Sequence, residues 1–121
     1  MQPIELSQFQ SLSAAILSDV LDSLGLMGQA MRPFMRPLDE GSVLIGRART
    51  GLYMPVECAG VRVVSGDIVF GDADGVVVIP QDRAAEVLER ARKKVTGENN
   101  TRAELEQGSL LGEVYRKYGV L

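Results

Sequence analysis

The sequence predicts a single α/β domain, in which a small, mainly β centre has a helix before it and helices after it. Short β-branched runs separated by Gly and Asp fill residues 60–80, as is typical of strands joined by tight turns. Apolar residues recur at helical spacing in residues 16–24 and again in residues 84–95. A chain of 121 residues is long enough for one such domain with a modest core.

Residues 60–80 predict three strands. Their apolar residues are Val61, Val63 and Val64 in the first, Ile68–Phe70 in the second and Val76–Ile79 in the third. The last run is apolar at four successive positions, and this predicts a strand that is covered on both faces. Pro80 cannot donate to a sheet ladder, so the strand is expected to end before it.

An acidic turn, Asp72-Ala73-Asp74-Gly75, joins the last two strands, and Gly75 is expected at a positive φ. Two carboxylates two residues apart can share a hard cation, so Asp72 and Asp74 are candidate metal ligands. The alternative is an Asx-turn, in which an Asp oxygen accepts a backbone N–H bond, and we favour it by roughly four to one. An EF-hand is excluded, because the loop lacks the further oxygen ligands and the late Glu.

The N-terminal part predicts an arm and a helix. Residues 1–10 are expected to be mobile, and they lack the basic start and apolar core of a signal peptide. Ser13 is expected to cap a helix that runs to about Leu24, and Gly25 suits its left-handed stop. The apolar stripe of this helix consists of Ile16, Leu17, Val20, Leu21 and Leu24.

Residues 27–40 are expected to be irregular, because two Arg-Pro pairs forbid a regular helix there. Their arginines, Arg32 and Arg36, are candidates for binding an anionic substrate through bidentate contacts. Surface solvation is the alternative, favoured by roughly two to one.

Residues 41–53 predict a strand with a bend at Gly46. After the bend Arg47 and Arg49 alternate with Ala48 and Thr50, which places the two arginines on one face. Met54-Pro55 ends this pattern.

The C-terminal part predicts several helices. The first follows Pro80, has Gln81 or Asp82 as its cap, and is expected to end at Gly97. Its stripe consists of Ala84, Val87, Leu88, Ala91 and Val95.

Two short helices are expected after it. Thr101 and Glu104 have the spacing of a capping box, which predicts a short helix that stops at Gly108. Ser109 is expected to cap another short helix through Tyr118.

Charge and residue usage narrow the functional classes. The net charge of −3 and the absence of a dense basic face argue against nucleic acid as a partner. The nearest basic cluster, residues 90–94, is expected to complement a helix C-terminus. No stretch has the length of a membrane span, so no membrane partner is expected.

Cys58 is the only cysteine, which excludes an intrachain disulfide and is compatible with a cytoplasmic location. Because the chain has no histidine, Cys58 lacks the usual base of a thiol nucleophile and is expected to be an inert packing residue. The lack of histidine also removes Ser-His-Asp catalysis and most zinc and haem sites.

Several segments, taken in order, resemble the RraA-like family. They are Leu17–Gly25, Ile45–Thr50, Pro55–Val61, Gly66-Asp67, Gly71–Pro80, Glu98-Asn99, Thr101-Arg102, Glu104-Leu105 and Tyr118–Leu121. The family includes 4-hydroxy-4-methyl-2-oxoglutarate aldolases with oxaloacetate decarboxylase activity and regulators of ribonuclease E activity. The resemblance implies a layered fold similar to the swivelling phosphohistidine domain, a trimer with active sites between subunits, a divalent metal (Mg or Mn), and a small 2-oxo acid as substrate.

The chain departs from the family pattern in its middle. Residues 1–54 resemble the family's N-terminal part and residues 55–121 its C-terminal part, as one domain with the central active-site segment missing. That segment carries an Arg-Asp pair, which holds the substrate carboxylate and the metal, and no Arg-Asp dipeptide occurs here. The catalytic and metal residues of the family therefore have no counterparts in this chain.

Three hypotheses follow from this departure. The chain is a metal-dependent aldolase or decarboxylase, a non-catalytic protein-binding module, or a truncated derivative without activity. Lys93 and Lys94 do not replace the missing centre as Schiff-base lysines, because they lie in a charged helical run. Loss of the centre is expected to expose sheet edges and apolar faces, which predicts self-association.

Overall fold

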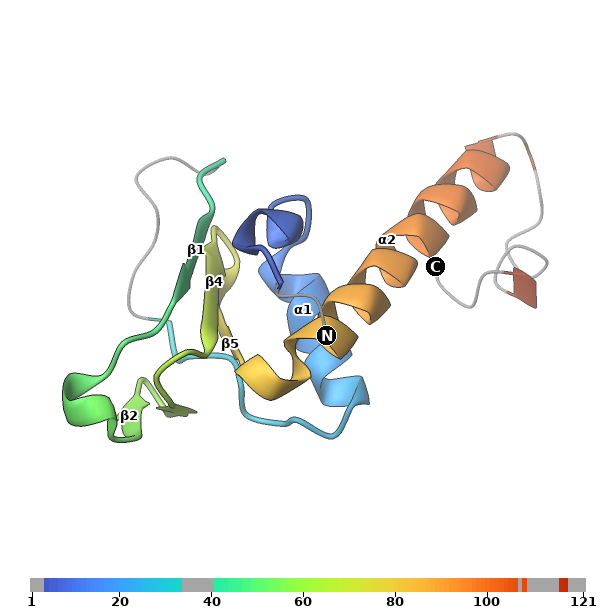
Figure 1. Ribbon diagram of the computed structural model, residues 1–121. Helices are drawn as coiled ribbons and strands as arrows, with labels where there is room; N and C mark the ends of the chain where they lie inside the picture. The colour runs from blue at the N-terminus through green and yellow to red at the C-terminus, as the bar shows by residue number, and fades with distance from the viewer. Residues whose placement is uncertain (1–3, 34–40, 107, 109–115, 118–121) are drawn as a thin grey trace.

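The structure is a computed structural model, and it describes residues 4–33, 41–106, 108, 116 and 117. A three-stranded antiparallel sheet, with strand order β1-β4-β5, has helices α1 and α2 packed on one face. A two-stranded sheet, β2-β3, lies at one end of the molecule (Figure 1). The α/β class predicted from the sequence is thereby confirmed. The helices and strands are α1 Ala14–Ser23, β1 Leu44–Arg47, β2 Val56–Cys58, β3 Val61–Val63, β4 Ile68–Asp72, β5 Gly75–Ile79 and α2 Ala84–Glu106.

The three strands predicted within residues 60–80 are present as β3, β4 and β5. β4 and β5 form a hairpin in which Asp72 pairs with Gly75, and Gly75 has a φ of 151°. β3 does not join this sheet, because it pairs with β2 instead.

β5 is covered on both faces, as its continuous apolar run predicts. Val77 and Ile79 belong to the main core beneath the helices. Val78 is fully buried on the opposite face, where it packs with Val61 and Val63 of β3. The strand ends at Ile79, directly before Pro80.

Helix α1 matches its prediction closely. The Ser13 side chain caps it by accepting a hydrogen bond from the Ile16 N–H at 3.2 Å. Leu17 and Leu21 on its stripe are fully buried. Gly25 follows with a φ of 78°, the left-handed stop.

The prediction of a mobile N-terminal arm is wrong for its described residues. Residues Leu6–Phe9 form a 3₁₀ helix, η1, and the Phe9 side chain is fully buried in the main core. Burial of an aromatic side chain supplies enough contact area to fix a short segment.

Helix α2 is longer than predicted, because it runs through Gly97 and ends at Glu106. A glycine inside a helix costs only about 1 kcal/mol, which the core contacts of the first turns offset. Thr101 is buried inside this helix, so the capping-box prediction is also wrong. Gly108 has the expected left-handed φ of 91°. The helix predicted from Ser109 through Tyr118 lies largely outside the described residues.

The strand predicted in residues 41–53 is shorter than expected and continues through Gly46. β1 covers four residues, and Gly46 pairs with Val69 in the ladder. Beyond it, Arg47 and Arg49 are exposed while Thr50 is buried, which confirms the alternation. The remaining residues form η2, Gly51–Tyr53.

Candidate functional site

The acidic turn is built around the carboxylate of Asp72. Its Oδ1 accepts a hydrogen bond from the Asp74 N–H at 2.9 Å, which is the Asx-turn alternative. Its Oδ2 accepts one from the Ala14 N–H, also at 2.9 Å. The second bond satisfies a free donor in the first turn of α1, so this carboxylate ties the β4–β5 hairpin to the helix.

A second aspartate, Asp67, ties the β3–β4 connection to the start of α2. Asp67 is buried, and its Oδ2 accepts a hydrogen bond from the Val64 N–H at 3.0 Å. Its Oδ1 accepts one at 3.2 Å from the N–H of Gln81, in the short helix η3 (Gln81–Arg83) that leads into α2. Sequence reasoning missed both helix contacts, since their partners lie 14 and 58 residues away.

The residues that the structure describes hold no ready-made cluster of metal ligands. Among them, no three His, Cys, Asp or Glu side chains converge as a possible metal site. Of the two candidate ligands, Asp72 has both oxygens committed to backbone N–H groups. Asp74 is exposed, and a Mg²⁺ held by this carboxylate would take most of its ligands from water or substrate.

The candidate arginines are dispersed rather than gathered. The guanidinium of Arg47 donates to the backbone carbonyls of Gly66 and Ile4, at 3.0 and 3.5 Å. Arg49 donates to the Tyr53 hydroxyl at 3.3 Å and lies 5.7 Å from the centre of its ring. Arg36 lies outside the described residues.

Two further predictions are corrected. Cys58 is exposed in β2, so it is not a packing residue. The basic cluster of residues 90–94 lies in the middle of α2 rather than at its end. Three of its side chains form ion pairs instead: Arg90 with Glu86, Lys93 with Glu89, and Lys94 with Asp19.

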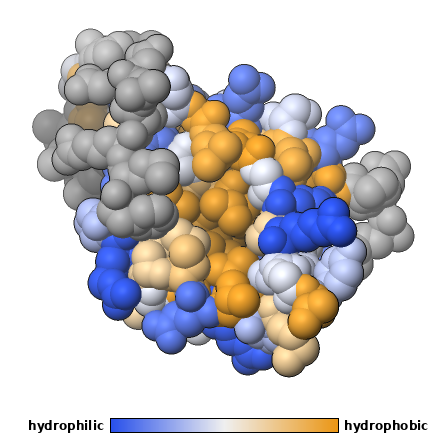
Figure 2. Space-filling model, turned by 90° about the vertical axis from the view of Figure 1, so that its left-hand side faces the viewer, coloured by the Kyte–Doolittle hydropathy of each residue, from blue (hydrophilic) through white to orange (hydrophobic). Residues whose placement is uncertain are grey.

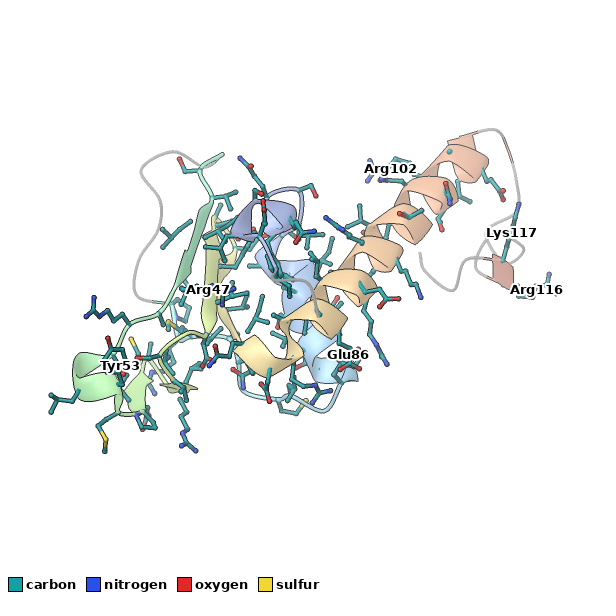
Figure 3. The ribbon with its side chains drawn as sticks, in the orientation of Figure 1. Arg47, Tyr53, Glu86, Arg102, Arg116 and Lys117 are labelled. Atoms are coloured by element: carbon teal, nitrogen blue, oxygen red, sulfur yellow. The ribbon has the colours of Figure 1, made fainter. Side chains whose placement is uncertain are left out.

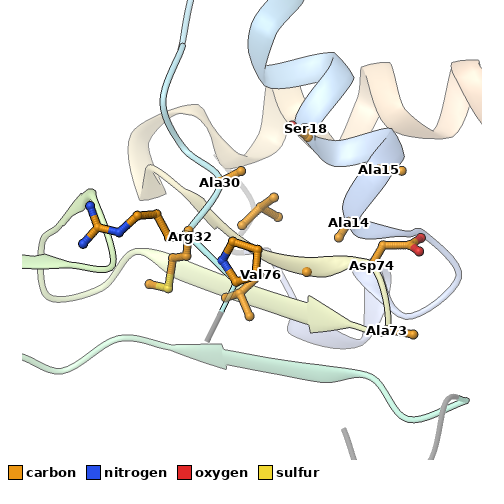
Figure 4. Close-up of a pocket in the computed structure, with 12 residues that line it drawn as sticks. Ala14, Ala15, Ser18, Ala30, Arg32, Ala73, Asp74 and Val76 are labelled. Atoms are coloured by element: carbon orange, nitrogen blue, oxygen red, sulfur yellow. The ribbon is translucent and has the colours of Figure 1, made fainter. Parts of the chain in front are cut away.

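A pocket of 310 Å³ lies between the start of α1, the segment 30–33 and the β4–β5 turn. Its wall is mostly apolar, with Ala14, Met31 and Val76 among its members. Figure 4 shows Arg32 and Asp74 at opposite ends of it, with the Arg32 side chain directed away from Asp74. The pocket thus has an apolar middle, a cationic end and an anionic end. We call it the α1 pocket.

An apolar knob, defined by Leu52, Tyr53 and Met54, follows the C-terminal end of β1. The exposed fractions of these side chains are 93%, 64% and 62%. Figure 3 shows Tyr53 at the outer limit of the molecule. Leu52 and Tyr53 adopt φ values of 55° and 56°, a region that costs roughly 1–2 kcal/mol for each residue with a Cβ.

The base of the knob is held firmly. Thr50 is buried, and its N–H and hydroxyl both lie 2.9 Å from the Ser65 hydroxyl. The Tyr53 N–H donates to the Thr50 carbonyl at 3.2 Å. The knob is therefore a preorganised turn that presents apolar side chains to solvent.

The outward face of the three-stranded sheet is apolar as well. Ile45, Phe70 and Val77 point to the helices, so Leu44 and Val76 lie on the other face. Leu44 is 64% exposed, and Val76 is half-buried. Figure 2 shows apolar side chains gathered on this side of the molecule. Within the described residues, β1 has β4 as its one strand neighbour and leaves its other edge unpaired.

The length and hydropathy of the helices decide whether they could span a membrane. None of the helices in the described part of the chain is both long enough and apolar enough to cross a bilayer.

Comparison with known proteins finds partial relatives, one of which has a name that belongs to the family that the motifs resemble. No protein-family model matches the chain. It is 40% identical over 57 residues to a protein of Halalkalibacterium halodurans named "Putative 4-hydroxy-4-methyl-2-oxoglutarate aldolase", covering 45% of this chain and 27% of that one. It is 39% identical over 63 residues to the uncharacterized protein MJ0644 of Methanocaldococcus jannaschii (52% and 30% covered). Protein DlpA of Legionella pneumophila is 34% identical over 83 residues (57% and 14% covered). The chain spans less than a third of the length of each of these relatives.

Solved structures support the fold. An uncharacterized protein from Pseudomonas syringae pv. tomato matches with a TM-score of 0.78 and 19% identity, over 97% of this chain and 96% of that one. A chain from a structure of novel cellulases from gut-associated microbes matches with a TM-score of 0.71 and 17% identity, over 82% and 89%. At this identity the likeness concerns the fold alone.

Proposed function

We propose that this chain is an RraA-like domain that has no lyase activity by itself and acts by binding polypeptide chains. The observation that carries the proposal is the engagement of Asp72, the better placed candidate ligand, by the N–H groups of Ala14 and Asp74. A metal that drew Asp72 out of these hydrogen bonds would break the contact between the β4–β5 hairpin and α1. The missing Arg-Asp dipeptide supports the same conclusion.

The polypeptide-binding part of the proposal rests on the apolar surface. Monomeric proteins rarely expose contiguous apolar patches larger than a few hundred Å². Within its described residues this chain exposes the knob, the outward sheet face near Leu44 and one edge of β1. Such features mark protein-binding surfaces, since burial of apolar area and pairing of edge strands both favour association.

The second candidate is a metal-dependent lyase, and the partial relative named as an aldolase favours it. Aldol cleavage of 4-hydroxy-4-methyl-2-oxoglutarate and decarboxylation of oxaloacetate both leave an enolate of pyruvate. A bound metal would supply the Lewis acid for that charge, and an arginine would hold the substrate carboxylate. In the described residues the arginine nearest to this role, Arg32, lines the same pocket as Asp74 but is directed away from it.

The deciding experiment measures pyruvate release from both substrates with purified protein and Mg²⁺ or Mn²⁺. Free metal ions decarboxylate oxaloacetate, so metal without protein is the blank and a chelator is the control. We expect no turnover above that blank. Turnover that depends on the protein and disappears with chelator would refute the proposal and would make the chain a lyase.

The origin of the shortened chain belongs to the same proposal. We take residues 1–54 and 55–121 as the two outer parts of an RraA-like domain, joined near the knob. A cytoplasmic location stays a prediction, with which a single exposed cysteine is compatible.

A further inference from the structure

The knob is the feature of the described chain that the fold least explains. Its two left-handed residues are Leu52 and Tyr53, neither of which is a glycine. Strain of this kind persists where the surroundings hold it, and it is concentrated at functional sites. Here the held conformation places Leu52 in solvent with 93% of its surface exposed, so the strain serves no core contact within the described residues.

The α1 pocket has the shape and chemistry to receive the knob of another molecule. A cavity of 310 Å³ with walls from Ala14, Met31 and Val76 can take an apolar side chain of the size of Leu52. The exposure of Leu52 shows that it does not occupy the pocket of its own chain. Both halves of the contact are therefore present on one chain, and the described residues do not bring them together.

The charges around the two surfaces are complementary. Arg49 lies on one side of the knob in the sequence and Glu57 on the other, and both side chains are exposed. The pocket offers Asp74 at one end and Arg32 at the other (Figure 4). Among the described residues the carboxylate of Asp74 has no hydrogen bond or ion pair, so it is available to a guanidinium. Charged groups at the rim set the orientation of a contact whose centre is apolar.

The apolar area fits a specific contact. Side chains of this size with these exposed fractions present on the order of 300 Å² of surface, comparable with the largest apolar patch on a typical monomer. Specific interfaces bury roughly 800 Å² from each partner, so the knob supplies a central part of such an interface and the sheet face around it the remainder.

We propose that the knob of one copy of this chain inserts into the α1 pocket of a second copy, with Arg49 of one facing Asp74 of the other. This inference rests on the proposed function and gives the polypeptide partner as the chain itself. A reciprocal exchange gives a two-fold dimer, whereas a head-to-tail contact gives a ring if its rotation closes and a filament if it does not. The contact defined by Leu52, Arg49 and Asp74 is the same in both.

The first test is sedimentation velocity over a range of protein concentrations. The wild-type chain is expected to associate to a discrete oligomer. Leu52→Asp is expected to raise the dissociation constant at least about thirtyfold, the effect of losing a central anchor. Met27→Asp is the matched control, because Met27 is also apolar and 69% exposed but lines neither surface. It should leave the dissociation constant unchanged.

The second test uses charge reversal and does not depend on how well Leu52→Asp folds. Arg49→Asp and Asp74→Arg are each expected to weaken association about tenfold, by placing like charges together. The double variant restores the opposite pair and should return to within about threefold of the wild type. Circular dichroism of each variant confirms that it is folded.

Three results would overturn the inference: a wild-type chain that stays monomeric, an oligomer that Leu52→Asp leaves intact, or a double variant as weak as its parents. Pyruvate release measured on the same samples distinguishes failure of the proposed function from failure of the knob-and-pocket contact. Turnover together with a knob-dependent oligomer would refute the proposed function alone. An inactive monomer would refute the present inference alone.

Discussion

Replacing Asp72 separates a structural carboxylate from a metal ligand. Asp72→Ala removes the acceptors of the Ala14 and Asp74 N–H groups, both at 2.9 Å. Loss of a helix cap costs about 1 kcal/mol, and a hydrogen bond to a charged group contributes about 1.5–3 kcal/mol. Because the bond to Asp74 is exposed, we expect the lower end, so the free energy of unfolding should fall by about 2 kcal/mol.

Urea unfolding followed by circular dichroism measures this difference, at a concentration where the chain is monomeric. Asp74→Ala is the matched control, since its exposed carboxylate should contribute less than about 0.5 kcal/mol. Asp72→Asn keeps one acceptor oxygen and should fall between the two variants. Equal stability of Asp72→Ala and Asp74→Ala would refute the reasoning. So would a stabilisation by Mg²⁺ that both variants lose, because only a shared metal site links the two carboxylates in that way.

The remaining predictions concern stability and use the same unfolding measurement. Phe9→Ala should lower the free energy of unfolding by about 3–5 kcal/mol, because Phe9 is fully buried. A small effect would favour the prediction that the N-terminal residues are mobile. Gly66→Ala should lower the free energy of unfolding by about 1–2 kcal/mol, because Gly66 has a φ of 98° and its new Cβ would lie 2.5 Å from the Gln81 Oε1. Gly46→Ala is the control: its Cβ meets no atom within 4 Å, so the variant should be neutral or slightly stabilising. Leu52→Gly should stabilise the monomer by roughly 1 kcal/mol by relieving the left-handed strain at φ 55°, and no change would mean that this strain is absent.

Much of the fold could be predicted because its signals are local. The four apolar residues of β5 predicted two covered faces, and Val77 and Val78 occupy those faces. Ser13 and Gly25 predicted the limits of α1, since capping depends on neighbouring residues. The same local reasoning failed at Gly97 and Thr101, because α2 continues through both, although such residues often end or begin a helix.

The candidate site could be predicted only in part, because its contacts are long-range. An acidic turn is visible in the sequence as an Asx-turn, and the Asp74 N–H bond to Asp72 confirms it. The contact of Asp72 with Ala14 spans 58 residues and has no sequence signal. The left-handed knob was missed for a different reason: Leu52 and Tyr53 are among the residues least suited to that conformation, so no pattern predicts it.

The arrangement of the sheet explains why such a domain would bind other chains. An antiparallel sheet usually has one apolar and one polar face, but here both faces are apolar. The helices cover the face with Phe70, and β3 covers the other face at Val78. Leu44 lies at the far end of that face and remains 64% exposed, on a strand whose outer edge no described strand pairs. The described part of the chain therefore builds a sheet that is apolar on both sides and covers the second side incompletely, which is the physical basis of the proposal that it binds a further polypeptide chain.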